Sequence, residues 1–428
     1  MQARRLFAVA LTFALALAVF AATRGDERAA AGRAGTVSAA APSLRPDADT
    51  DAQVRRLQAA VRRGAAREAE LAAAYLQKAR ESGDPSFYSR ADGVLGRALA
   101  RGPEDPAELV EAAALAAGRH EFREAVRLAR RARSLAPGSN AAYPVLVDAL
   151  VELGRYRDAE RALQRMIDRK PTLPAYARVS YFRELTGDLR GAAAALRLAV
   201  AAGGPVPENF AYVQSLLGSL ELNRGRLAAS RRAYAAALVA VPGYAPAEAG
   251  RARLAARSGD LRGAIRRWRS LVARLPLPEY VIGLGEAELA AGRVRAGRAD
   301  LALVRAQERL LDDAGVNTDV ELAIYEADHG DQLRAVRLAR VAWRQAPSVR
   351  SADALGWALT RSGDRRAGLR WARRALRLGS LDPTFRYHAG IAAGDTPEGR
   401  RHLRLALRHG LGAHPLHANR ARAALEDR

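Results

Sequence analysis

The most informative absence from this sequence is cysteine, which does not occur among its 428 residues. Without a thiol the chain can form no disulfide, no thiolate-held zinc or iron–sulfur site and no cysteine nucleophile. Aromatic residues are also scarce, at 6%, whereas alanine, leucine and arginine are abundant. A chain rich in strong helix formers and poor in aromatic and β-branched residues is predicted to be all-α.

Lysine is nearly absent as well. Only Lys78 and Lys170 are lysines among 69 basic residues, which face 46 acidic residues and leave a formal net charge of +23. An excess of this size predicts non-specific attraction to polyanions. A second interpretation is compositional, because a GC-rich coding sequence favours arginine and alanine over lysine. The apolar fraction of 49% excludes wholesale disorder.

One long uncharged apolar run lies at the N-terminus. Arg4 and Arg5 precede the segment LFAVALTFALALAVFAA, which extends from Leu6 to Ala22. A basic flank and a short apolar run are typical of a secretory signal, so residues 1–22 are predicted to be a signal peptide or signal anchor, with a buried core helix as the alternative. Residues 23–50, which contain almost no large apolar residue, are predicted to be a disordered linker. We therefore expect an exported, extracytoplasmic protein that is either secreted or tethered to the membrane by an uncleaved anchor.

A repeated unit occupies most of the remaining chain. The string GRYRDAERALQRMIDRKP, which begins at Gly154, recurs with variation as GDLRGAAAALRLAVAAGG from Gly187 and as GDLRGAIRRWRSLVARLP from Gly259. Turn glycines of this kind follow one another after 33 to 38 residues, and the closing prolines Pro137 and Pro171 are 34 residues apart. A helical stretch lies on each side of the glycine, so the unit is predicted to be a helix, a glycine turn and a second helix.

These strings resemble the tetratricopeptide repeat family, whose period is about 34 residues. The residues that match its Leu-Gly pair, its small positions and its closing proline include Leu217, Gly218, Leu284, Gly285, Leu355, Gly356, Ala159, Ala192, Ala264, Ala335, Pro103, Pro137, Pro171, Pro242, Pro276 and Pro347. The resemblance implies a right-handed α-solenoid of about ten stacked helix-turn-helix repeats over residues 72–411. It adds a lead-in helix at 51–71 and a C-terminal cap at 412–428. Stretches such as YARVSYFRELTGDLRGA, from Tyr176, further resemble a subgroup of exported bacterial proteins with this repeat, which implies architecture rather than an activity.

The resemblance also implies two surfaces. First helices of this repeat line an inner groove, and the groove candidates for contact with a protein or peptide partner are Tyr181, Glu184, Glu286, Glu321 and Trp357. Second helices line the convex side, where spacings of three, four and seven residues place arginines on one helical face. The predicted convex basic face comprises Arg127, Arg161, Arg232, Arg266, Arg337, Arg370, Arg373 and Arg374. Its alternative interpretation is a solvated surface without a ligand.

No sequence pattern predicts catalysis or a bound cofactor. A phosphate loop, a dinucleotide motif and a nucleophile elbow do not occur, so we expect no enzyme activity and no cofactor. Five of the seven histidines lie in the last 41 residues, but HGLGAHPLH, from His409 to His417, matches no zinc spacing and predicts a polar cap rather than a metal site. Nucleic acid is disfavoured as a partner because no recognition helix or stacking aromatics accompany the arginines.

Two functions of different classes follow from these observations. The first is a non-enzymatic, extracytoplasmic scaffold or adaptor that presents a concave groove to a peptide or protein. The second is an envelope-organising protein that docks to anionic envelope polymers or lipid headgroups through the convex basic face. Salt separates the two, because screening weakens exposed charge contacts more than it weakens a groove complex with buried apolar anchors.

Overall fold

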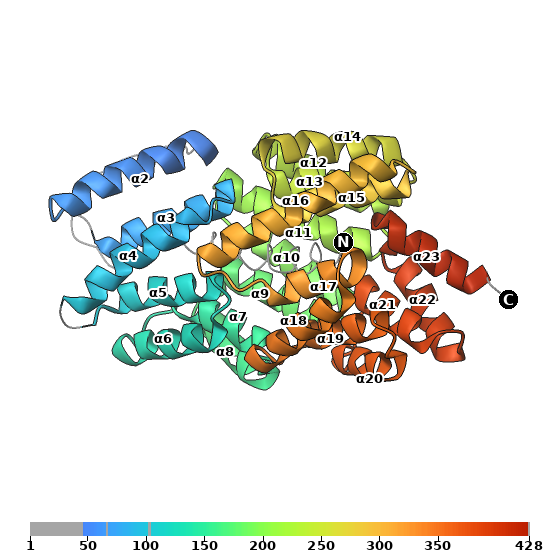
Figure 1. The fold of residues 1–428 in the computed structure, drawn as a ribbon. Coiled ribbons are helices and arrows are strands. Elements are labelled where there is room, and N and C mark those ends of the chain that lie inside the picture. The colour runs from blue at the N-terminus through green and yellow to red at the C-terminus, as the bar shows by residue number, and fades with distance from the viewer. Residues whose placement is uncertain (1–45, 66, 102–103, 427–428) are drawn as a thin grey trace.

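The structure is a computed structural model that describes residues 46–65, 67–101 and 104–426. The predicted signal segment and most of the predicted linker lie outside these ranges. The described residues form 22 α-helices and one short 3-10 helix, without any strand (Figure 1). Within the same ranges, none of the helices combines the length and apolar character that a membrane span needs.

Twenty of the helices form ten pairs, in each of which consecutive helices pack on one another. The first helices of the pairs are α3 (Glu68–Ser82), α5 (Pro106–Gly118), α7 (Tyr143–Glu152), α9 (Leu173–Leu185), α11 (Pro207–Asn223), α13 (Ala245–Arg257), α15 (Pro278–Ala290), α17 (Asp319–His329), α19 (Val349–Arg361) and α21 (Pro383–Ala393). The second helices are α4 (Ser86–Ala100), α6 (Phe122–Leu135), α8 (Tyr156–Arg169), α10 (Leu189–Ala202), α12 (Leu227–Ala240), α14 (Leu261–Arg274), α16 (Val294–Asp313), α18 (Gln332–Gln345), α20 (Arg365–Ala375) and α22 (Pro397–Arg408). The predicted all-α solenoid of about ten repeats is therefore confirmed.

The repeated sequence signals account for the helix boundaries. In α10 the side chain of Asp188 accepts a hydrogen bond from the backbone N–H of Gly191 at 2.8 Å, and in α14 Asp260 does the same for Gly263 at 2.7 Å. The Gly-Asp dipeptide between the two helices of a pair is thus a turn followed by an N-cap. Apolar residues at spacings of three and four then form the buried face, as with Ala159 in α8.

Two of the ten pairs contain a lengthened helix. Helix α11 has 17 residues and α16 has 20, whereas α8, α10, α12, α14 and α18 each have 14. The loop after α16 reaches the turn between α5 and α6, where the backbone N–H of Asn317 donates to the carbonyl of Arg119 at 3.0 Å. The loop after α16 therefore connects units that are five repeats apart.

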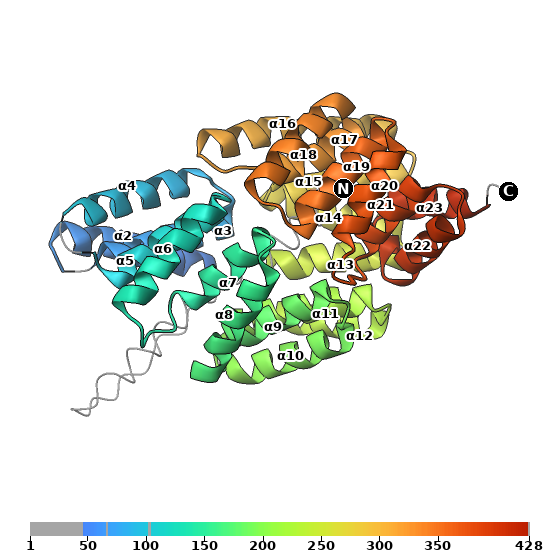
Figure 2. The ribbon, with the colours of Figure 1, turned by 90° about the horizontal axis from the view of Figure 1, so that it is seen from below.

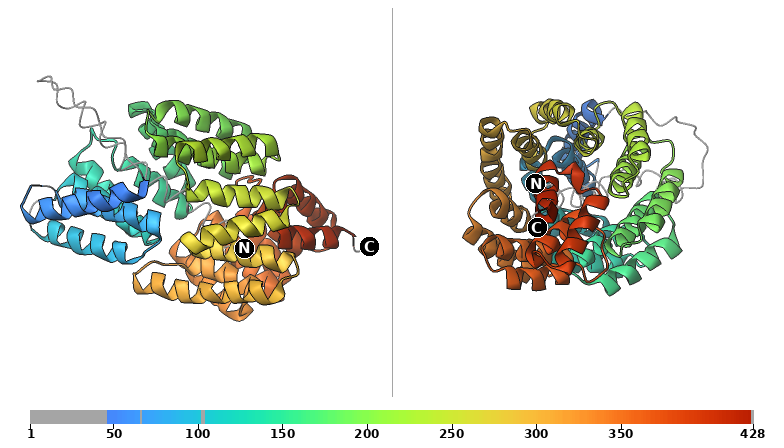
Figure 3. Two further views of the ribbon diagram at one scale, coloured as in Figure 1. Left: turned by 90° about the horizontal axis from the view of Figure 1, so that it is seen from above. Right: turned by 90° about the vertical axis from the view of Figure 1, so that its right-hand side faces the viewer.

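The stack coils so tightly that successive turns of the superhelix touch (Figures 2 and 3). The α7–α8 turn contacts the loop between α18 and α19, where the hydroxyl of Tyr156 accepts a hydrogen bond from the backbone N–H of Val349 at 2.8 Å. In the same way, Gly187 of the α9–α10 turn lies against the carbonyl of Gly379. The inner surface, where the sequence predicted a concave groove, is consequently enclosed by two turns of helices.

Gly154 has a backbone conformation and a close neighbour that both disfavour a side chain at this position. Its φ is +68°, and a Cβ there would lie 2.3 Å from the backbone carbonyl oxygen of Pro347 in the neighbouring turn. We expect Gly154→Ala to lower the free energy of unfolding by about 2–3 kcal/mol, from left-handed strain and a clash that neither backbone can easily relieve. Gly259→Ala is the matched control, because its φ of +85° carries the strain while no atom lies within 4 Å of the added methyl. Equal losses in urea unfolding of the two variants would contradict tight contact between the turns.

Single helices at the two ends complete the fold. At the N-terminal end α2 (Pro46–Arg62) precedes the first pair, and of the residues 51–71 in which the sequence predicted a lead-in helix, 68–71 belong to α3. At the other end, η1 (Leu411–Ala413) contacts α13, and α23 (Pro415–Glu426) contacts α15 as well as α21 and α22. The C-terminal segment thus crosses from the last pair to the sixth and seventh, as the end-on view shows in red (Figure 3).

Candidate functional site

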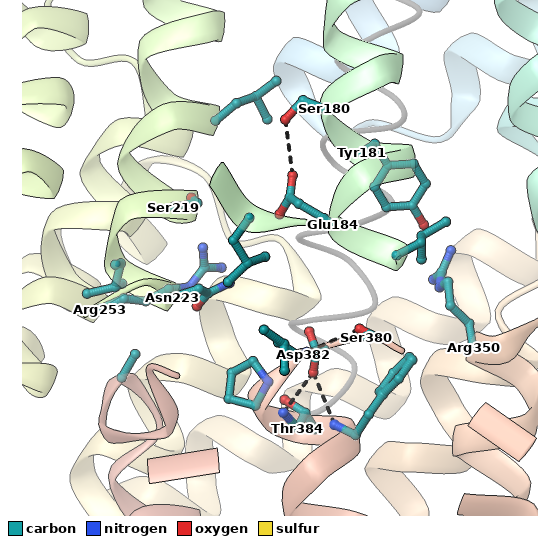
Figure 4. A pocket seen from close by; sticks show the side chains of 18 of the residues that line it. Ser180, Tyr181, Glu184, Ser219, Asn223, Arg253, Arg350, Ser380, Asp382 and Thr384 are labelled. Atoms are coloured by element: carbon teal, nitrogen blue, oxygen red, sulfur yellow. Dashed lines mark hydrogen bonds between the residues drawn. The ribbon is translucent and has the colours of Figure 1, made fainter. Parts of the chain in front are cut away.

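The inner surface contains a cavity of about 160 Å³ between α9, α11 and α13 on one side and α19 and α21 on the other (Figure 4). Much of its wall is apolar, with Leu216, Leu222, Ile324 and Phe385 among the lining residues. The polar side chains of the wall include Ser180, Tyr181, Glu184, Ser219, Asn223, Arg253, Arg350, Asp382 and Thr384. An apolar wall with a few convergent polar groups is the usual character of a ligand site.

Two of the predicted groove residues, Tyr181 and Glu184, lie in this cavity. Both belong to α9, and the Glu184 carboxylate accepts a long hydrogen bond of 3.4 Å from the Ser180 hydroxyl. Burial raises the pKa of Glu184 to about 8, and the negative charge of Asp382 on the opposite wall contributes in the same direction. A neutral carboxyl at pH 7 that would ionise readily beside a cation is therefore present in the wall.

The other predicted residue near the cavity, Glu321, is held in an ion-pair cluster. Arg350, which lines the cavity, donates to Glu321 Oε1 on α17 and to Glu152 Oε1 on α7, each at 3.0 Å. All three side chains are buried. Glu152 precedes Arg350 by 198 residues, so this cluster joins the first turn of the superhelix to the second.

A second buried pair supports the wall between α7 and α9. The guanidinium of Arg178 donates two hydrogen bonds to the carboxylate of Asp148, one from Nε to Oδ1 at 2.7 Å and one from a terminal nitrogen to Oδ2. It also donates to the backbone carbonyls of Pro144 and Pro174. Burial raises the pKa of Asp148 to about 6, although Arg178 opposes that rise. Because Arg178 and Asp148 bond to each other, we interpret this pair as holding α7 and α9 together at the cavity wall rather than as binding a ligand.

The remaining predicted groove residues, Trp357 and Glu286, do not reach the cavity. The Trp357 side chain is only 1% exposed; its indole stacks on His388 with 4.3 Å between ring centroids and donates to Asp328 Oδ1 at 3.2 Å. Glu286 is also buried and lies 3.0 Å from His329 Nε2. Sequence phasing placed both on inward helix faces, but it gave no indication that the C-terminal segment would cover that part of the inner surface.

Helix α23 covers this part through His417. The His417 ring stacks on Tyr387 at 4.4 Å between centroids, and its Nε2 lies 3.6 Å from Asp328 Oδ1. Burial lowers the pKa of His417 to about 4. Burial would raise the pKa of Asp328, but the interaction of Asp328 with His417 keeps that pKa low. Among the described residues no cluster of three or more side chains could hold a metal ion.

All eight arginines of the predicted convex basic face are exposed. Three of them pair with acids on the same surface: Arg127 with Glu124, Arg161 with Asp158 and Arg373 with Glu398. Arg374 lies over two tryptophan rings instead. The structure thus places these side chains on the outer helices, where they can reach a partner.

Several cavity residues were absent from the predicted site, notably Asp382 and Thr384 at the start of α21. The carboxylate of Asp382 caps α21 by accepting the backbone N–H of Thr384 at 2.7 Å and of Phe385 at 3.1 Å. The tenth unit lacks the Leu-Gly pair, so its inward positions could not be phased. The Asp-Pro-Thr sequence does signal a helix start, but nothing local indicates that this start faces α9.

Comparisons with known proteins identify the repeat in one part of the chain. A family profile described as tetratricopeptide repeat matches residues 114–180, which confirms the repeat predicted there, and no curated protein matches the sequence. Among solved structures, the chain is similar to a human IFIT1 dimer with PPP-AAAA, at 16% identity and a TM-score of 0.47, over 73% of this chain and 72% of that one. It is also similar to PilW, a widely conserved type IV pilus biogenesis factor, at 16% identity and a TM-score of 0.41, over 50% of this chain and 99% of PilW.

Proposed function

We propose that this chain, a tetratricopeptide-repeat protein, is a non-enzymatic, extracytoplasmic scaffold that binds an extended segment of a partner protein inside its superhelix. Solenoids of such repeats offer long concave surfaces to their partners. The basic and apolar pattern of residues 1–22 supports export. The observation that carries the proposal is the cavity, in which an apolar wall surrounds the carboxyl group of Glu184.

Two acidic residues of the cavity wall, Glu184 and Asp382, bear on the chemistry of the partner segment. Glu184 and Asp382 lie close enough for the charge of Asp382 to raise the pKa of Glu184. An ammonium or guanidinium group between them would favour the ionised form of Glu184, while Leu216 and Phe385 would pack on the neighbouring apolar side chains. We therefore propose that the bound segment carries a basic residue flanked by apolar ones.

The binding of such a segment should depend on pH in one direction. A cation prefers the ionised form of Glu184, which in the free protein forms only as the pH rises through about 8. The affinity for a lysine peptide is therefore expected to increase with pH and to level off above pH 8, because below that value binding must first remove a proton. Glu184→Gln should make the affinity independent of pH in this range, and titration of fluorescence anisotropy would measure it.

The direct test uses fluorescein-labelled decapeptides of alanine, leucine and serine with one central lysine, glutamate or glutamine. We expect the lysine peptide to bind best, and Glu184→Gln to weaken it by about tenfold to a hundredfold, the effect of losing a hydrogen bond to a charged group. Glu160→Gln is the matched control, since Glu160 is exposed on α8. Leu216→Trp should fill the cavity and abolish binding of every peptide. If no peptide binds, or if the two glutamine variants behave alike, the proposal is wrong.

The convex basic face supports a second candidate, docking to anionic envelope polymers or lipid headgroups. The specific observation is that its arginines are exposed and that Arg232, Arg266, Arg337 and Arg370 make no ion pair with any described residue. Vesicles containing an anionic phospholipid should then bind at about 0.05 M salt and be released at about 0.5 M, since exposed charges are strongly screened. Peptide binding in the cavity should change far less over the same range.

A further inference from the structure

A depression of about 380 Å³ lies on the outer surface between α18 and α20. We call it the tryptophan pocket. Its lining residues are Arg340, Trp343, Arg344, Leu355, Leu359, Asp364, Ala367, Arg370 and Trp371. The half-buried indoles of Trp343 and Trp371 meet edge to face with 4.7 Å between ring centroids. Leu355 and Leu359 of α19 are buried and form an apolar floor beneath them.

The sequence shows that Trp343 departs from the repeat. It stands four residues before the closing proline, Pro347, and the residues at the same distance before the other closing prolines include Ile167, Leu238 and Val272. Each of those aliphatic residues packs against a core cluster as a partly buried side chain. Before the closing proline Pro137 the same place holds Arg133. The repeat therefore does not need an aromatic residue here, and the indole of Trp343 adds apolar surface that the other units lack at this place.

The rim of the tryptophan pocket is basic. Arg340, Arg344 and Arg370 are exposed and form no ion pair with any described residue. The guanidinium of Arg374 lies 4.7 Å from the centroid of Trp343 and 5.5 Å from that of Trp371. Among the described lining residues the single acid is Asp364, and its carboxylate already accepts the backbone N–H of Ala367 at 2.9 Å as the N-cap of α20.

We propose that the tryptophan pocket binds an acidic protein segment that carries one bulky apolar side chain. Tryptophan and arginine dominate the energetics of protein interfaces, especially in pockets that exclude water. An apolar anchor would reach the floor formed by Leu355 and Leu359, while flanking carboxylates would pair with the rim arginines in the bidentate geometry that guanidinium favours. This site lies on the outer side of the helices and shares no lining residue with the cavity on the inner side, so it does not depend on the function proposed above.

Other polyanions fit the same geometry less well. A flat bilayer could meet the rim arginines but could not place an apolar group on a recessed floor. Stacking of nucleic-acid bases needs an open ring face, and here the two indoles pack against each other with Arg374 over both. A recessed apolar floor surrounded by a basic rim therefore favours an acidic peptide over a bilayer or a nucleic acid as the ligand.

The test uses the full chain and a fluorescein-labelled peptide with one phenylalanine flanked on each side by three glutamates. We expect saturable binding at about 0.15 M salt, weakened at least about tenfold when the phenylalanine is replaced by alanine or the glutamates by glutamine. The double variant Arg340→Glu, Arg370→Glu should also weaken binding at least about tenfold. The matched control, Arg232→Glu with Arg266→Glu, makes the same change of charge on exposed residues of α12 and α14.

A second variant separates the pocket from charge alone. Trp343→Ile introduces the residue that α8 carries at the same place in its repeat, so the helices should still pack, and circular dichroism would confirm it. We expect it to weaken the peptide about tenfold as well. Equal losses in the two charge-reversal variants, no effect of removing the phenylalanine, or binding of anionic vesicles in place of the peptide with the same dependence on Arg340 would each overturn the proposal.

Discussion

Replacement of Arg350 by methionine is expected to lower the free energy of unfolding by about 3–5 kcal/mol, the cost of leaving buried charges without their partner. Arg350 donates to Glu152 and Glu321 at 3.0 Å each, and the three side chains are almost fully buried. Burial alone would lower the pKa of Arg350, but the charges of Glu152 and Glu321 have the larger effect and raise it. The substitution would remove the cation and leave both carboxylates in a medium of low polarity.

Two further variants test whether the loss comes from the unpaired acids. The triple variant Arg350→Met, Glu152→Gln, Glu321→Gln should recover most of the stability, because a neutral cluster carries no uncompensated charge. Arg337→Met, on the exposed face of α18, should change the free energy of unfolding by less than about 0.5 kcal/mol. Urea titrations of all three would measure these values. A triple variant as unstable as Arg350→Met would show that the loss is one of packing.

Acidification is expected to detach helix α23 while the repeats remain folded. The docked helix keeps His417 neutral, with a pKa lowered to about 4 mainly by burial, whereas in a detached helix the pKa would return to about 6.5. Between these two values the detached state binds more protons, so docking is fully favourable above pH 6.5 and weakens as the pH falls toward 4. The full effect is about 3 kcal/mol, or roughly two orders of magnitude in the docking equilibrium.

The charged and titratable groups that act on the His417 ring shift its pKa in opposite directions. Asp328 lies 3.6 Å from Nε2 and, with Glu286, favours the charged ring, while burial and His388 oppose it. Hydrogen exchange of the α23 amides should therefore accelerate by about a hundredfold between pH 7 and pH 4.5, after correction for the intrinsic pH dependence. His417→Asn should abolish the acceleration, whereas His402→Asn on α22 should leave it in place. Faster exchange across all helices together would indicate global unfolding and contradict the prediction.

The helices and the repeat count could be predicted because they depend on neighbouring residues. A small residue such as Ala159 or Ala335 is fully buried where the two helices of a pair approach, and its place relative to the turn glycine is visible in the sequence. The exposure of the convex arginines follows from the same periodicity. Repeat packing is local, so local patterns were enough to derive it.

The enclosed inner surface could not be predicted in the same way. The superhelical pitch results from small rotations at each repeat, which add up over many units and leave no single residue as a signal. The contact of Glu152 with Arg350 and the cover of α23 over Trp357 both depend on that pitch. Tyr181 and Glu184 could be predicted, because the repeat pattern shows which face of α9 points inward. Asp382 and Thr384 could not, because they reach the cavity from the second turn of the superhelix.

The contacts between successive turns also set how the chain must fold. In an open solenoid each repeat touches only its neighbours, so folding spreads from any point and the ends fray independently. Here Tyr156 bonds to Val349 across 193 residues and Arg119 to the loop at Asn317 across a similar span. Closing such long loops lowers the folding rate and makes the first and last repeats gain or lose structure together. A nascent chain that ends before α19 would therefore hold its first repeats without their partners, and the molecule should reach its native stability only when synthesis is complete.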